Sequence, residues 1–316
     1  MGSRPRRGLA HPNRCWSMTA VPTVTTVTTP LAPGPARPRR RQLRAALLVL
    51  PAVIPVAIVV IGGVGATLLQ SLGLMPLVGA AELSTAAFDD TDELLTSALL
   101  SLSIAVVSTA IAAVVGFFTA VLIISGNWGG RIVTVLSAAA VTVPHLVGAA
   151  TVGLLLSDSG VLARLFGISP DAWPALVAGP TWFAVIAEYA WKESAFIALI
   201  IVGTLATRIT SYDEAAAVLG AHRSARLRLV LFPLAAPSLL VASAIAFAYT
   251  LGSYEVAWML GATYPEPLSV MALRLFNTAS LTARPEAAAI GVITVVLTAA
   301  VVGAAMLGLR RMRAWR

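Results

Sequence analysis

The chain has 316 residues, of which 58% are hydrophobic and 11% are charged, and its mean hydropathy is +0.87. This composition excludes an ordinary soluble domain and indicates a membrane protein. The net charge of +8 does not indicate nucleic-acid binding, because the arginines stand in short blocks beside apolar runs rather than along one face of a domain.

Metal-ligating and disulfide-forming residues are sparse. The chain has one cysteine, Cys15, and its histidines, His11, His145 and His222, are far apart and lack the spacing of a zinc motif. We therefore expect no metal site and no disulfide within the chain.

The first 41 residues differ from the rest of the chain. They are rich in proline, threonine and arginine without hydrophobic periodicity, so they predict a disordered cytoplasmic tail. The apolar run behind the arginines continues to about Leu72 without a convincing cleavage site, which favours a retained first span over a secretory signal. We assign residues 42–316 to a transmembrane domain.

Six apolar segments follow, each close to the roughly 20 residues that cross a bilayer. Only helices satisfy all their backbone amides within one such segment. The sequence therefore predicts an all-α, polytopic membrane protein with six transmembrane helices. The predicted spans are 45–71, 97–125, 131–156, 181–206, 229–252 and 285–309. Between the third and fourth spans we expect a short surface helix and a loop.

The basic residues predict the orientation, because cytoplasmic loops retain arginine and lysine. With the N-terminus inside, 18 of the 22 basic residues fall on the cytoplasmic side, and most acidic residues fall outside. Both termini are therefore expected in the cytoplasm of a cell membrane.

The fourth predicted span carries ionisable residues, which are costly in a membrane and mark functional candidates. Glu188 and Lys192 are four residues apart with the acid first, so we expect them to form a neutralising pair. Glu193 then has no partner in its own helix, and it could bind a cationic substrate or pair with a neighbouring subunit. His145, beside Pro144 in the third span, fits a packed polar residue or a partner of a kink.

The largest predicted inner loop follows the fourth span. Ser211 and Glu214 have the spacing of a capping box, which predicts that a helix begins there. Asp213 and Glu214 suit the positive end of that helix, and Gly220 suits the left-handed residue that ends it. A bare connector would need only a few polar residues. This small-faced helix is therefore more consistent with docking to a partner than with a simple connection.

The fifth predicted span ends in residues that could bind a cation. Tyr249, Ser253, Tyr254 and Glu255 supply aromatic faces and a carboxylate, which suit an organic cation. Tyrosine and tryptophan at this position could equally anchor the helix at the membrane surface.

The inner loop resembles the EAA motif of binding-protein-dependent ABC transporter permeases. The matching residues are Glu214, Ala215, Ala216, Gly220, Val230 and Pro233. The family pattern has isoleucine and leucine where this chain has Val230 and Phe232, and the resemblance covers about residues 42–316.

The resemblance implies a type I ABC importer permease-like fold in a bacterial inner or plasma membrane. It implies that residues 212–221 form a coupling helix seated in a cytoplasmic ABC ATPase dimer, which binds ATP and Mg. The other implied partners are a second permease subunit, the same or a sister, an extracytoplasmic solute-binding protein and membrane lipid. The chain itself lacks the GxxxxGK[ST] loop of an ATPase, so we predict no cofactor, no catalytic residue and a transport subunit rather than an enzyme.

Three stretches, AWKESAFIALI, LGSYEVAWMLG and YPEPLSVMALRLF, look similar to the spermidine/putrescine branch of the family. This resemblance implies a polyamine-like solute, with sulfate, iron, thiamine or a sugar as alternatives, and a scaffold without transport as a further one. An intramembrane enzyme is disfavoured, because every aspartate lies in a predicted loop and no serine nucleophile motif is present. The candidate pathway residues are Glu188, Trp191, Lys192, Glu193, Tyr249, Ser253, Tyr254 and Glu255.

Overall fold

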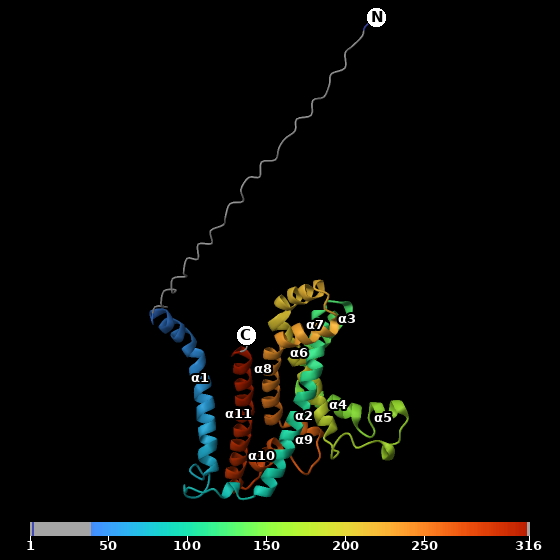
Figure 1. Cartoon of the computed structure of the whole chain (residues 1–316). Helices are drawn as coiled ribbons and strands as arrows, with labels where there is room; N and C mark the ends of the chain where they lie inside the picture. Colours follow the sequence, from blue (N-terminus) through green and yellow to red (C-terminus); the bar gives the residue numbers. More distant parts are fainter. Residues whose placement is uncertain (1, 3–38, 315–316) are drawn as a thin grey trace. The chain divides into compact units, whose positions relative to one another are not determined.

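The computed structural model describes residue 2 and residues 39–314, without the side chains of residues 39–46, 206–211 and 312–314. Most of the predicted tail, residues 1–41, lies outside the described residues. The chain divides at Val56, within α1 (Arg39–Ser71), into two units, and the following paragraphs concern the second, Ala57–Arg316. Every regular element in the described part is a helix, as predicted (Figure 1).

Three long helices form the centre of the second unit: α2 (Thr91–Ile124), α6 (Phe183–Val218) and α8 (Phe232–Gly252). Small residues let them approach closely, as is usual between membrane helices. At Gly116 of α2, an added Cβ would lie 2.8 Å from the carbonyl oxygen of Ser194 in α6. The shared core is made of alanines, isoleucines and Phe117.

Five of the described helical segments are long and apolar enough to cross a membrane by length and composition. They are Leu47–Ser71, Thr91–Ile124, His145–Phe166, Arg223–Gly252 and Leu281–Arg311. The fourth predicted span belongs to α6, which has 36 residues but carries Glu188, Lys192 and Glu193 within its first turns.

The third predicted span, 131–156, is not one helix, and this prediction is wrong. It is divided into α3 (Trp128–Thr142) and α4 (His145–Leu156). Pro144 lacks the N–H that would continue the helix, and a residue before proline avoids the helical region. Val143 accordingly has an extended backbone with ψ 127°.

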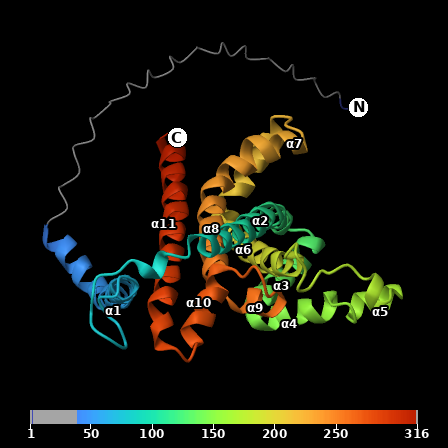
Figure 2. The same ribbon diagram turned by 90° about the horizontal axis from the view of Figure 1, so that it is seen from below.

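After α4, the chain forms a short helix and a loop before α6, as predicted. The helix is α5 (Val161–Phe166), and a 3-10 turn follows at Pro170–Ala172. Both views show α4 and α5 on the opposite side of α2 and α6 from α11 (Arg284–Ala314) (Figures 1 and 2).

The two ends of the bundle carry different short helices. The end of α6 and α7 (Arg223–Arg226) lie at one end, while α9 (Glu255–Leu260) and α10 (Leu268–Asn277) lie at the other (Figure 1). A π-helical turn, Leu227–Leu231, joins α7 to α8.

An ion-pair cluster fastens α10 to the start of α2. Arg274 donates a hydrogen bond of 2.6 Å to Glu266 and lies 3.5 Å from Glu93. The hydrogen bond to Glu266 raises the pKa of Arg274, so this side chain keeps its charge.

Candidate functional site

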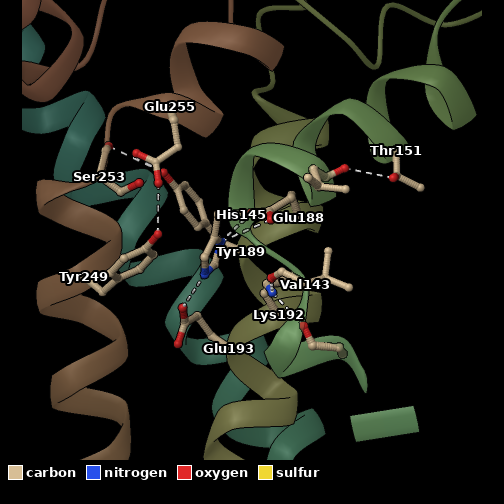
Figure 3. A network of polar contacts seen from close by, with 12 residues as sticks. Val143, His145, Thr151, Glu188, Tyr189, Lys192, Glu193, Tyr249, Ser253 and Glu255 are labelled. Carbon is tan, nitrogen blue, oxygen red and sulfur yellow. Dashed lines mark hydrogen bonds and ion pairs between the residues drawn. The ribbon is translucent and has the colours of Figure 1, made fainter. Parts of the chain in front are cut away.

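A cluster of ionisable side chains lies inside the bundle, where α6 faces the start of α4 and the end of α8 (Figure 3). Glu188 is fully buried, and Lys192 and Glu193 are only 4% and 6% exposed. Burial of three ionisable groups within six residues is expensive unless each has partners. Their partners therefore define what this cluster can do.

His145 stands between the two glutamates of α6. Its Nδ1 is 3.2 Å from Oε1 of Glu188, and its Nε2 is 3.7 Å from Oε1 of Glu193. As the first residue of α4, it is aimed at α6 by the helix break at Pro144. Glu193, expected to have no partner within its own helix, thus faces a histidine from another helix. The proline before His145 was the sequence signal that could have suggested this.

Lys192 does not pair with Glu188, and the prediction of a neutralising pair is wrong. No ion pair within 4.0 Å joins these two described residues. Instead Lys192 donates hydrogen bonds to the carbonyl oxygen of Ala140, at 2.6 Å, and to that of Val143. The helix break at Pro144, where the sequence suggested at most a kink, provides these acceptors.

The end of α8 and the start of α9 complete the cluster. The Tyr249 hydroxyl donates to Oε1 of Glu255 at 3.1 Å, and the Tyr249 ring lies 4.6 Å from the His145 ring. The carbonyl oxygen of Ser253 accepts hydrogen bonds from Tyr189, at 3.5 Å, and from a serine of α10. Tyr189, almost fully buried, was missed in the sequence.

Not every predicted pathway residue joins the cluster. Tyr254 stands at the N-cap position of α9 without a capping hydrogen bond and is 43% exposed, and Trp191 is 42% exposed on α6. A cavity of about 180 Å³ lies beside the cluster. Its lining residues are Val141, His145, Lys192, Glu193, Phe196, Ile245 and Tyr249. This space is smaller than sites for drug-sized ligands, which start near about 300 Å³.

The segment with the predicted coupling helix begins differently from the prediction. No helix starts at Ser211, because α6 runs unbroken to Val218. The sequence has no glycine or proline between Gly203 and Gly220, so nothing stops the helix before the capping-box pattern. The predicted cap itself lies outside the described side chains.

The end of this segment matches the prediction. Gly220 has a left-handed backbone with φ +82°. The N–H groups of Gly220 and Ala221 donate 3.0 Å hydrogen bonds to the carbonyls of Ala217 and Ala216. This pattern is a Schellman motif, which satisfies the last carbonyls of a helix.

The tip of α6 exposes both apolar and charged side chains. Val218 and Leu219 are each 87% exposed, and Glu214 and Ala215 are also exposed. Asp213 forms a 3.0 Å ion pair with Arg226 of α7. Val218, Leu219 and Arg226 were not singled out in the sequence.

A groove of about 700 Å³ lies beside this tip. It is bounded by the end of α2, the tip of α6 and α7, and its lining includes Asp213, Glu214 and Arg223. Exposed apolar side chains next to a groove of this size are typical of a docking surface.

Among residues 39–314, no three His, Cys, Asp or Glu side chains are placed to hold a metal ion. The expectation of a chain without cofactors stays a prediction.

A buried cluster of ionisable side chains among apolar helices marks a candidate functional site of a membrane protein. Residues 112–313 match the family described as "Binding-protein-dependent transport system inner membrane component". The chain therefore belongs to this family, and it is a permease subunit of an ABC importer.

Solved structures share the fold. A bacterial ABC transporter that imports alginate has 17% sequence identity and a TM-score of 0.65, over 86% of this chain and 98% of the other. A bacterial alginate ABC transporter in complex with an alginate-bound periplasmic protein has 19% sequence identity and a TM-score of 0.68. The match covers 87% of this chain and 96% of the other. An inward-facing methionine ABC transporter has 19% sequence identity and a TM-score of 0.56. The match covers 70% of this chain and 97% of the other. A search of curated protein sequences finds no match.

Proposed function

We propose that this permease subunit carries a small organic cation of the polyamine type. One observation supports this proposal: two carboxylates flank His145 and a third is linked to it through a tyrosine, while the lysine among them is engaged elsewhere. Glu188 and Glu193 flank His145, and Glu255 contacts Tyr249, which lies against the same ring. Lys192 donates to backbone carbonyls. The cluster thus has more carboxyl groups than cationic side chains to pair with them.

Protonated amines match this chemistry. Carboxylates form charge-assisted hydrogen bonds with ammonium groups, and tyrosine faces attract cations. In this proposal Glu193, Tyr249 and Glu255 contact the solute, Glu188 adds negative charge behind His145, and Trp191, Ser253 and Tyr254 lie farther along the pathway. A second permease subunit, the same or a sister, closes the other half of the path.

Uptake by the reconstituted transporter tests the substrate class. The complex with its ATPase and binding protein is placed in liposomes and offered spermidine, putrescine, sulfate, iron, thiamine and a sugar. We expect uptake of a polyamine, with a KM at least about tenfold higher for Glu193→Gln, because a charged contact of about 1.5–3 kcal/mol is lost. Uptake of sulfate, a sugar or another solute, without a polyamine response, would overturn this proposal.

We further infer that residues 212–221 couple the chain to an ABC ATPase dimer that binds ATP and Mg. The exposed tip at Val218 and Leu219 supports docking. Because α6 is continuous from Glu188 to this tip, a displacement at the tip reaches the ion cluster through one rigid helix, about 45 Å long at about 1.5 Å per residue. ATP-driven closure would thus reorient the pathway between inward and outward access.

Mutation of the tip tests the coupling. Glu214→Ala and Gly220→Pro are expected to abolish ATP-dependent uptake in a correctly inserted complex. Retained uptake would contradict the coupling role. If crosslinking from this tip captures no ATPase, a scaffold without transport would be the better interpretation.

The proposed orientation places both termini and the α6 tip in the cytoplasm, with α9 and α10 toward the binding protein. Cysteine labelling of intact cells tests this. A cysteine at Leu219 should resist a membrane-impermeant reagent, and a cysteine at Tyr264, 74% exposed, should react. The opposite pattern would invert the topology.

A further inference from the structure

The break between α3 and α4 lies opposite two charged residues of α6 that are one helical turn apart. Lys192 reaches the carbonyl end of α3, through Ala140 and Val143. Glu188 lies at the amide end of α4, where its Oε1 would be 2.8 Å from a Cβ on Gly148. The two side chains therefore face opposite ends of two half-helices (Figure 3).

Such a break leaves backbone groups without helical partners. In a continuous helix, the carbonyl of Ala140 would accept from the N–H of residue 144, but Pro144 has none. Unpaired backbone groups are expensive inside a membrane. The end of α3 is also the negative end of its dipole, and the start of α4 is the positive end of its own.

We propose that Lys192 and Glu188 are a clamp that holds the broken third span by its two dipole ends. Lys192 supplies donors and positive charge to the end of α3, while Glu188 supplies negative charge to the start of α4. Gly148 has no side chain, which lets the carboxylate approach. Both are thus positioning residues, and the clamp aims His145 toward Glu193.

This inference does not depend on which solute is carried. It divides the buried residues of the cluster by role: Glu193, Tyr249 and Glu255 remain available to a solute, while Lys192 is committed to the backbone. It also explains why an acid and a lysine at the spacing of a helical pair do not contact each other.

A distance measurement across the break tests the clamp. Spin labels are attached to cysteines at Val135 in α3 and Leu154 in α4, which are 68% and 70% exposed, in a chain with Cys15→Ser. The assembled transporter is studied in lipid nanodiscs, with the labelled subunit diluted by unlabelled subunit. We expect a narrow distance distribution that Lys192→Met broadens and Lys192→Arg preserves, since arginine keeps the donors and charge.

Transport supplies a second readout. Lys192→Met should lower the maximal uptake rate about tenfold, the effect of losing roughly one buried hydrogen-bonded partner, while KM changes less than about twofold. Lys192→Arg should restore most of the rate. A large rise in KM without broadening of the distances would make Lys192 a solute ligand and overturn the clamp.

A double-mutant cycle separates the clamp from a direct ion pair. If Glu188 and Lys192 neutralised each other, the double variant Glu188→Gln/Lys192→Met would be less damaged than either single variant. The clamp predicts instead that both changes add, because each loosens a different half-helix. Rescue in the double variant would overturn the proposal.

A variant that restores the missing backbone N–H keeps the test usable if Lys192→Met folds poorly. If Lys192→Met gives little protein, Pro144→Ala/Lys192→Met supplies an N–H for the carbonyl of Ala140. A protein yield that recovers in Pro144→Ala/Lys192→Met supports the clamp. If Lys192→Arg does not keep the wild-type distances, the clamp is overturned. These distances require no transport, so a wrong substrate assignment would leave them unchanged.

Discussion

The two halves of α6 use the same kinds of charged side chain in opposite settings. In the first half, Glu188, Lys192 and Glu193 are almost completely buried, and their partners come from α3 and α4. In the second half, Asp213 and its partner Arg226 have side chains that are 30% and 23% exposed. A buried charge cannot exchange its partner for water without a large cost, whereas a partly exposed charge can do so at a smaller cost.

This difference separates two tasks along one helix. The buried half should determine stability and the shape of the pathway, and the exposed half should determine contact with a partner at little cost in stability. Mutations that remove one charge or one apolar side chain in each half can break or sharpen this comparison.

The largest loss of stability is expected for Glu188→Gln. The change keeps the shape but removes the carboxylate that faces His145, so the free energy of unfolding should fall by about 3 kcal/mol, as for a broken buried pair. Chemical unfolding in detergent measures this. Glu82→Gln, at an exposed position, is the control and should be neutral. Equal effects of the two changes would contradict the comparison.

The tip of α6 should show the reverse behaviour. Leu219→Asp places a charge on a fully accessible side chain, so stability should change by less than about 0.5 kcal/mol. ATP-driven uptake should nevertheless fall about tenfold, because an apolar docking contact worth about 1.4 kcal/mol is lost. Leu83→Asp, 73% exposed, is the matched control for a surface leucine. Uptake that falls equally in both variants would argue against docking at the tip.

The backbone of the tip should be sensitive to Gly220→Ala. Nothing lies within 4 Å of a Cβ at this position, so the effect comes only from the left-handed backbone and should be about 1–2 kcal/mol. Hydrogen exchange of the Gly220 and Ala221 amides should report it. Gly203→Ala, also in open space but helical, should be neutral or stabilising. Unchanged exchange in Gly220→Ala would show that the Schellman motif is not the constraint.

Local signals made some features readable from the sequence. Apolar segments predicted a helical membrane protein, and a glycine after an alanine run predicted how α6 ends. Both follow from rules that act over a few residues. The start of the predicted coupling helix failed for the same reason, since a capping-box pattern also fits inside a helix that nothing interrupts.

The partners of the buried charges could not be read locally. The spacing of Glu188 and Lys192 favoured contact between them, but each found a better partner at the break in the third span. That break depends on Pro144, and its acceptors become available to Lys192 only once α3 packs against α6. Tertiary packing, rather than helical spacing, thus decides which charges meet.

The smallest effect is expected for the ion pair at the exposed end. Asp213→Asn or Arg226→Gln should each cost about 0.5–1 kcal/mol, less at high salt, because both side chains are partly solvated. The exchanged pair Asp213→Arg/Arg226→Asp should recover part of that loss in a double-mutant cycle. A coupling free energy between Asp213 and Arg226 as large as the loss of stability in Glu188→Gln would mean that the tip is held as firmly as the core. In that case α6 could not divide its tasks by burial, and the tip would belong to the rigid part of the pathway.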